Sequence, residues 1–125
     1  MEKKVLLVED DAFLRSLLSN RLKRDGIDVV TATTGDAAVE AIKSNNPDLV
    51  LLDIILPGKS GFEIMEEIKA DPQVPNVPVI IISNLGQDSD IERGRELGVA
   101  DYLVKADTPI DDLVSKIRDF LNTPN

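Results

Sequence analysis

The sequence predicts an α/β fold in which a doubly wound, five-stranded parallel sheet lies between five helices. Five short aliphatic runs alternate along the chain with segments whose apolar residues recur every three or four positions, a pattern typical of this fold class. The runs are apolar almost throughout, as expected for parallel strands buried on both faces. Most of them also end abruptly at a polar residue, which marks where each strand stops.

The strands are expected where the aliphatic runs lie. The predicted strands are residues 4–8, 27–32, 48–52, 79–82 and 101–104. Each has the length of an ordinary strand in a globular protein. The run at 27–32 follows Gly26, which ends the preceding helical pattern as a C-cap residue would.

The first two helices have recognisable starts. The first is expected over residues 11–24, with Asp11 as its N-cap. The second is expected after a cap at Thr33 or Thr34 and stops before Asn45, because a proline follows shortly afterwards and disfavours helix.

The last three helices differ in the strength of their signals. The third passes through residues 62–68, and a weaker fourth is expected at about 89–97, with Gly94 inside it. The fifth has the clearest start, with Thr108 as the predicted N-cap and Pro109 at the first helical position, and its apolar face continues to residue 121.

Length and composition exclude several classes of protein. A chain of 125 residues is expected to form one domain, residues 1–125, with a core from about 4 to 121. It has no cysteine, no apolar run of membrane-spanning length and no apparent signal peptide, so we expect a cytoplasmic protein without disulfides or membrane insertion. The net charge of −9 argues against direct binding to nucleic acid.

Polar side chains follow four of the predicted strands. These residues are Glu9 and Asp10, Asp53, Ser83, and Lys105. Because the carboxyl ends of parallel strands meet at one edge of a sheet, where ligands bind, we expect these side chains to share a cleft.

This constellation resembles the receiver domain of bacterial two-component response regulators, the CheY-like superfamily. The resemblance covers essentially the whole chain, and it includes the stretch from Leu52 to Gly61, in which a proline follows the aspartate by four residues and a glycine by eight. It implies a flavodoxin-like sheet with strand order 2-1-3-4-5.

The resemblance implies a role for each polar residue. Asp53 would accept a phosphoryl group as an acyl phosphate, Lys105 would pair first with that carboxylate and then with a phosphoryl oxygen, and Ser83 would hydrogen-bond another phosphoryl oxygen. Glu9, Asp10, Asp53 and the backbone carbonyl of Ile55 would hold Mg²⁺, with Mn²⁺ as a substitute.

The implied function is signal transduction in a phosphorelay, not enzymatic turnover of an external substrate. A partner histidine kinase or histidine phosphotransfer protein would donate the phosphoryl group, since the chain has no histidine. Ser83 and Tyr102 would switch the face formed by residues 89–97, 101–104 and 109–121 toward a downstream protein target. We expect a monomer or a weak, phosphorylation-dependent dimer. The donor is expected to dock near Leu14, Leu17, Leu18 and the loop at Pro57.

Two positions depart from the family pattern, and two further positions bear on how long a phosphoryl group would last. Ala106 stands where a proline usually follows the lysine, so the Lys105–Ala106 peptide is predicted to be trans. Asn84 follows Ser83 in place of a smaller residue and is expected to narrow the mouth of the site. Ile55 and Leu85, both apolar, are expected to shield a phosphoryl group from water and so to slow its loss.

Two other functions are weighed against this one. A receiver fold that binds partners without phosphorylation is the main alternative, and Asn84 and Ala106 leave it open. A haloacid-dehalogenase-like phosphatase also uses an aspartate after a strand, but it needs a second aspartate two residues later, where this chain has Ile55. Metal-dependent modification of Asp53 separates the three.

Overall fold

A computed structural model describes residues 2–123 and confirms the predicted fold class. The strands are β1 (Lys4–Val8), β2 (Asp28–Ala32), β3 (Leu49–Leu52), β4 (Val79–Ser83) and β5 (Asp101–Val104). The helices are α1 (Ala12–Arg24), α2 (Gly35–Asn45), α3 (Gly61–Ala70), α4 (Asp88–Glu96) and α5 (Ile110–Asn122), with a short 3₁₀ turn, η1, at Lys105–Asp107.

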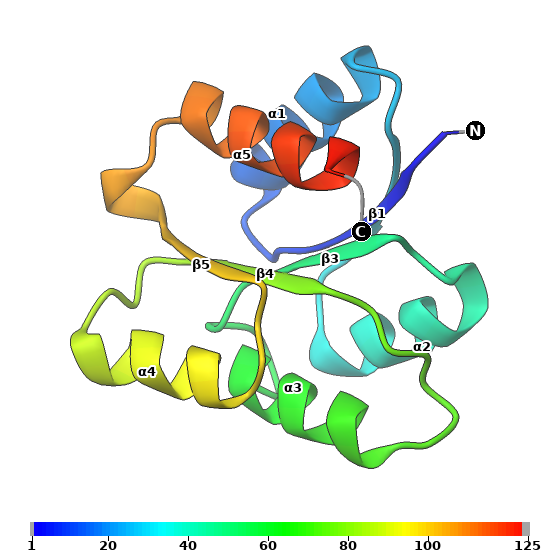
Figure 1. Cartoon of the computed structure of the whole chain (residues 1–125), viewed down its shortest axis with the longest axis vertical. Coiled ribbons are helices and arrows are strands. Elements are labelled where there is room, and N and C mark those ends of the chain that lie inside the picture. The colour runs from blue at the N-terminus through cyan, green and yellow to red at the C-terminus, as the bar shows by residue number, and fades with distance from the viewer. Residues whose placement is uncertain (1, 124–125) are drawn as a thin grey trace.

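The strands form one parallel sheet in the order β2-β1-β3-β4-β5, as the family resemblance implied. Figure 1 shows the sheet as the middle layer, with α1 and α5 on one side and α2, α3 and α4 on the other. β1 pairs with β3 so that Val8 lies opposite Leu52. The residues that follow these two strands, including Glu9 and Asp53, are therefore brought to the same edge of the sheet.

Hydrophobic clusters on both faces of the sheet hold the three layers together. Successive residues of a strand point to opposite faces, and accordingly Val5 and Leu7 belong to the cluster under α1 and α5, whereas Leu6 and Val8 belong to the cluster under α2 and α3. All four are buried. The strands therefore need apolar side chains on both faces, which explains why their sequences do not alternate.

The start of the last helix differs from the sequence-based prediction. The helix begins at Ile110, and Pro109, with an extended backbone, takes the N-cap position that had been expected for Thr108. Thr108 instead follows η1, and its N–H donates to the carbonyl of Lys105. The 3₁₀ turn thus uses the residue that would otherwise have capped the helix.

Other element boundaries shift by a residue. Ile27 lies outside β2 because its N–H donates to the carbonyl of Leu22 at the end of α1. Asp11 caps α1 as predicted, its side chain accepting from the N–H groups of Phe13 and Leu14. Thr34, rather than Thr33, caps α2.

The peptide between Lys105 and Ala106 is trans, as predicted, like all the other peptide bonds of the described residues. Among residues 2–123, no helix is both long and apolar enough to cross a membrane.

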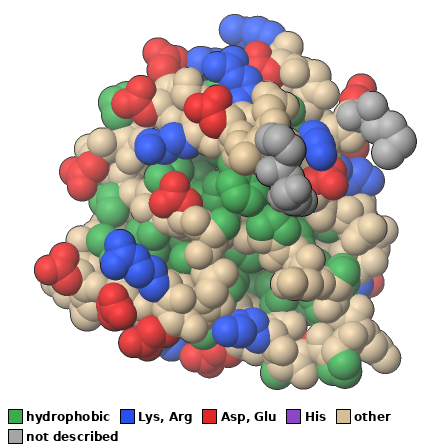
Figure 2. All heavy atoms as spheres, viewed as in Figure 1, with side chains coloured by type: hydrophobic (Ala, Val, Ile, Leu, Met, Phe, Trp, Pro, Cys, Tyr) green, Lys and Arg blue, Asp and Glu red, His purple; other side chains and the backbone are tan. Residues whose placement is uncertain are grey.

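The helices leave part of the apolar layer uncovered. In Figure 2 the hydrophobic side chains exposed on the viewed face gather near its middle, and most of the charged side chains surround them. This distribution follows from the layered architecture, because helices cover the faces of the sheet but not its rim.

Gly61 allows α3 to begin directly against the end of β3. Its N–H donates to the carbonyl of Ile54 at 2.8 Å. A Cβ at position 61 would lie 2.8 Å from the Cα of Ile54 and closer still to the carbonyl oxygen of Asp53. Backbone atoms cannot give way as a flexible side chain can, so only glycine fits here.

We therefore expect Gly61→Ala to lower the free energy of unfolding by about 1–3 kcal/mol, the usual cost of overpacking. Urea denaturation followed by circular dichroism measures this. Glu63→Ala, an exposed change in the same helical turn, is the control and is expected to be nearly neutral. A Gly61→Ala protein as stable as the wild type would contradict the tight packing.

Candidate functional site

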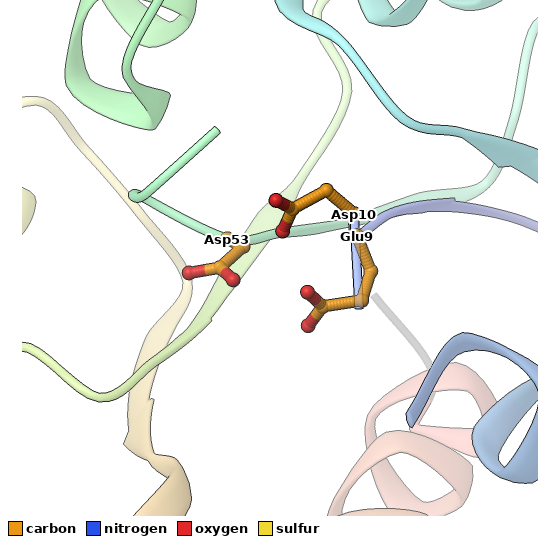
Figure 3. A group of neighbouring side chains, drawn as sticks. All are labelled: Glu9, Asp10 and Asp53. Atoms are coloured by element: carbon orange, nitrogen blue, oxygen red, sulfur yellow. The ribbon is translucent and has the colours of Figure 1, made fainter. Parts of the chain in front are cut away.

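Three carboxylates gather beyond the ends of β1 and β3. The side-chain oxygens of Glu9, Asp10 and Asp53 that could bind a metal ion all lie within 4.8 Å of one another. Figure 3 shows the three side chains projecting from these two strand ends, with their carboxylates close together. Glu9 and Asp53 are buried, whereas Asp10 is exposed. The arrangement has the oxygen donors and the negative charge that a hard divalent cation requires.

Lys105 bridges two of these carboxylates. Its Nζ lies 2.7 Å from Oε1 of Glu9 and 2.9 Å from Oδ2 of Asp53. The side chain enters the site from the residue that follows β5. One ammonium therefore partly offsets the charge of two buried carboxylates, which would otherwise repel each other.

The two oxygens of Asp53 have different surroundings. Oδ1 accepts from the backbone N–H groups of Ile54 at 2.7 Å and Ile55 at 3.3 Å. Oδ2 accepts from Lys105. The backbone bonds fix the orientation of the carboxylate, and Oδ2 faces the lysine.

Burial and charge act together on Glu9 and Lys105. Burial raises the pKa of Glu9, and the nearby charge of Asp53 raises it further, although the bond from Lys105 opposes both. Burial lowers the pKa of Lys105, but its bonds to Asp53 and Glu9 outweigh this, so the pKa is raised overall. The lysine is therefore charged throughout the physiological range.

A shallow cavity of about 360 Å³ opens over the carboxylates. It is lined by Glu9, Asp10, Asp11, Asp53, Ile55, Asn84 and Lys105. Asn84 and Ile55 thus border it, as their positions in the sequence suggested. Leu85 does not. Its side chain lines a separate hollow of about 450 Å³ between α3 and α4.

Ser83 is the last residue of β4, and its hydroxyl is hydrogen-bonded within the protein. The side chain is fully buried, and its Oγ accepts from the N–H of Leu85 at 3.3 Å. The carbonyl of Leu85 in turn accepts from the hydroxyl of Tyr102. A chain of hydrogen bonds therefore joins the end of β4 to the only tyrosine of the sequence.

Sequence reasoning missed two contributors to the site. Arg15, in the first turns of α1, donates through one guanidinium nitrogen to the backbone carbonyls of Glu9 at 3.0 Å and Asp10 at 3.3 Å. Leu85 contributes its backbone rather than its side chain. A cation shortly after the acidic run at residues 9–11 was a visible signal for Arg15, whereas nothing in the sequence distinguishes the backbone of Leu85.

Comparison with known proteins identifies the family. Residues 5–118 match the model of the response regulator receiver domain, and the chain belongs to this family. It is similar to the probable transcriptional regulator ycf27 of Guillardia theta, with 39% identity over 99% of this chain and 47% of that protein. It is 35% identical to the phosphate regulon transcriptional regulatory protein PhoB of Escherichia coli (strain K12), over 94% of this chain and 51% of PhoB.

Solved structures of receiver domains superpose closely on the chain. The BeF₃-activated N-terminal receiver domain of Klebsiella pneumoniae RstA matches with a TM-score of 0.86 and 34% identity, covering 97% of this chain and 100% of that one. The phosphorylated cyanobacterial phytochrome response regulator RcpA matches with a TM-score of 0.88 and 31% identity, covering 100% and 98%. By contrast, the chain spans about half the length of the two regulators named above.

The environment of Tyr102 predicts a change of stability at alkaline pH. Burial, together with the charges of Asp90 and Asp53, raises the pKa of Tyr102 from its ordinary value of 10.0 to about 12. The folded protein therefore holds the phenolic proton more tightly than the unfolded chain does. Stability is unaffected by this group below the unfolded pKa, and it falls as the pH rises through 10.0 toward about 12.

Tyrosinate absorbance measures this titration directly, because no other tyrosine contributes. We expect a midpoint well above 10.0, and we expect Tyr102→Phe to remove this component of the alkaline loss of stability. A midpoint at the ordinary value in the folded protein would show that Tyr102 is solvated.

Proposed function

We propose that this receiver domain takes a phosphoryl group onto Asp53 from a histidine-bearing partner protein and passes the signal to a protein target. The observation that supports this most strongly is the fixed, buried carboxylate of Asp53, with one oxygen on backbone N–H groups and the other on Lys105. A carboxylate held in this way is positioned for in-line attack on phosphorus.

The transfer exchanges one bond for another. An oxygen of Asp53 forms the new bond to phosphorus as the donor's nitrogen–phosphorus bond breaks, and the electron pair of that bond returns to the imidazole. Lys105 then neutralises a phosphoryl oxygen in place of the carboxylate charge it had paired with. Asn84 lines the cavity, and its side-chain amide would donate a hydrogen bond to a phosphoryl oxygen there.

Glu9, Asp10, Asp53 and the carbonyl of Ile55 are the residues that would hold Mg²⁺. The close spacing of the three carboxylates fits a hard cation. When bound, the ion supplies positive charge that neutralises the transferring phosphoryl oxygens. Both carboxylate oxygens of Glu9 already accept hydrogen bonds, from Lys105 and from the N–H of Asp11, and both oxygens of Asp53 accept them as well. The exposed carboxylate of Asp10 is therefore the freest of the three to bind the ion.

The donor would dock on apolar side chains beside the cavity. Among the described residues, the strongly exposed large hydrophobics are Phe13, 78% exposed, and Ile55, 58% exposed. Ile55 lines the cavity, and Phe13 lies two residues after Asp11, which lines it too. Because both lie at or near the cavity over Asp53, these two side chains are the apolar groups that an approaching donor would meet first.

The leucines of α1 were the expected docking residues, and their burial now distinguishes them. Leu18 is buried, while Leu14 and Leu17 are only partly accessible. Phe13, which sequence reasoning did not select, offers more exposed apolar surface to a partner than any of them.

The switch would act through the hydrogen bonds that connect Ser83, Leu85 and Tyr102. A phosphoryl oxygen would accept a hydrogen bond from the hydroxyl of Ser83, and a movement of Oγ toward it would draw Oγ away from the N–H of Leu85. A shift of Leu85 then moves the carbonyl that Tyr102 binds. This would change the face made by α4, β5 and α5.

Two of the arginines on that face are already paired within the protein. Arg93 bonds to Glu66 at 3.3 Å and lies 4.4 Å from the centre of the Phe62 ring. Arg118 pairs with Asp25 at 3.3 Å. Fewer charges are therefore available for pairing between two copies, which favours a monomer or, at most, a weak dimer on phosphorylation.

The test is the intact mass of the protein after incubation with acetyl phosphate and Mg²⁺. We expect one added phosphoryl group in the wild type, none in Asp53→Asn and little in the presence of a chelator. Asp28→Asn, an exposed carboxylate at the start of β2, is the matched control and is expected to be labelled normally. A folded wild type that stays unlabelled would favour the phosphorylation-independent interaction module.

The position of Ile55 predicts a slow loss of the phosphoryl group. Ile55 is an apolar residue bordering the cavity, and it cannot orient an attacking water. We expect Ile55→Asn to shorten the half-life of phosphorylated Asp53 about tenfold, which corresponds to ~1.4 kcal/mol of barrier.

The matched control is Leu85→Asn, since Leu85 lies outside the cavity and is expected to alter the half-life much less. Decay of the labelled mass after removal of the donor gives both rates. Equal effects of the two substitutions would mean that access of water to Asp53 is not set by the residues lining the cavity.

A further inference from the structure

Gly94, in the middle of α4, lies directly against the ring of Tyr102. A Cβ at position 94 would be 3.0 Å from Cδ2 and 3.4 Å from Cε2 of Tyr102. It would also be 3.3 Å from Cδ1 of Ile81, a fully buried residue of β4. Gly94 is itself the one buried residue of α4. The helix therefore contacts this part of the sheet through its backbone.

The backbone conformation of α4 does not require a glycine there. Gly26, Gly58 and Gly98 have positive φ angles, but Gly94 does not. Glycine is a poor helix former, and α4 has only nine residues. Gly94 thus weakens a short helix although its backbone conformation does not need a glycine. The absence of a side chain, which leaves space for the ring of Tyr102, explains it best.

Tyr102 makes the last hydrogen bond of the series that begins at Ser83. The hydroxyl of Tyr102 reaches the carbonyl of Leu85 while the ring lies over Gly94. The N–H of Leu85 donates to Ser83, at the end of β4. Ile81 blocks the space beneath the ring, so a side chain at position 94 would compete with the ring for one place.

We propose that Gly94 is a positioning residue of the switch: its missing side chain is what keeps Tyr102 between α4 and β5, with its hydroxyl on Leu85. A residue with a Cβ at position 94 pushes the ring of Tyr102 outward and weakens its link to Ser83 through Leu85. This rests on the proposed function only for its consequence in signalling, because the packing itself can be measured without phosphorylation.

The exposure of Tyr102 can be measured from its own fluorescence. The chain has one tyrosine and no tryptophan, so the intrinsic fluorescence excited through tyrosine comes from Tyr102 alone. Acrylamide is the quencher of choice, because a net charge of −9 would repel an anionic one. We expect Gly94→Ala to displace the ring by a few tenths of an ångström and so to raise the quenching constant measurably above that of the wild type. Ser89→Ala, an exposed change in α4, is expected to leave it unchanged.

A double-mutant cycle separates positioning of the ring from helix propensity. Alanine favours helix over glycine, so in a Tyr102→Ala background Gly94→Ala should raise the thermal midpoint. With Tyr102 present, the same change should lower the midpoint or leave it unchanged. If Gly94→Ala alone does not fold and the double variant does, the coupling between the two positions is equally demonstrated.

Unchanged quenching together with additive midpoints would overturn the proposal. The test of Gly94 can be judged separately from the proposed function. The same preparations can be incubated with acetyl phosphate and Mg²⁺, and their intact masses then show whether Asp53 is phosphorylated. A wild type that is not labelled at Asp53, with Gly94→Ala still exposing Tyr102, would refute phosphoryl acceptance and leave the positioning role intact.

Discussion

The contact on which the site depends is the bridge that Lys105 makes between Glu9 and Asp53, at 2.7 and 2.9 Å. Two carboxylates a few ångströms apart repel each other by about 3–4 kcal/mol at an effective dielectric constant of ~20. A single lysine offsets part of this, and Asp10 adds a further negative charge beside it. The balance leaves the cleft with an excess of negative charge, and the proposed Mg²⁺ site depends on that excess.

The sheet makes this contact possible. Glu9, Asp53 and Lys105 follow β1, β3 and β5, and parallel pairing aligns the carboxyl ends of all three strands. Apolar layers on both faces fix the strands in place. The buried scaffold holds the charged groups close together, whereas α4 is short and has a single buried residue.

The sequence predicted those parts of the fold and site whose structure is determined mainly by one interaction. Buried strands must be apolar on both faces, so their positions and the convergence of the residues after them could be predicted. It was less informative where two local solutions compete. Thr108 and Pro109 both suit a helix start, and only the 3₁₀ turn closed by Thr108 decides between them. The packing of Gly94 on Tyr102 depends on how α4 folds back against β4 and β5, which neither helical spacing nor a strand pattern encodes.

The most direct test of the charge balance is the affinity for Mg²⁺, measured by titration calorimetry on the wild type and on two variants. Removing a carboxylate with Asp10→Asn should weaken binding strongly. Removing the competing cation with Lys105→Met should strengthen it, because Glu9 and Asp53 lose the positive charge that they share. Binding that is absent from the wild type, or that neither substitution changes, would contradict an acidic cleft balanced between a lysine and a metal ion.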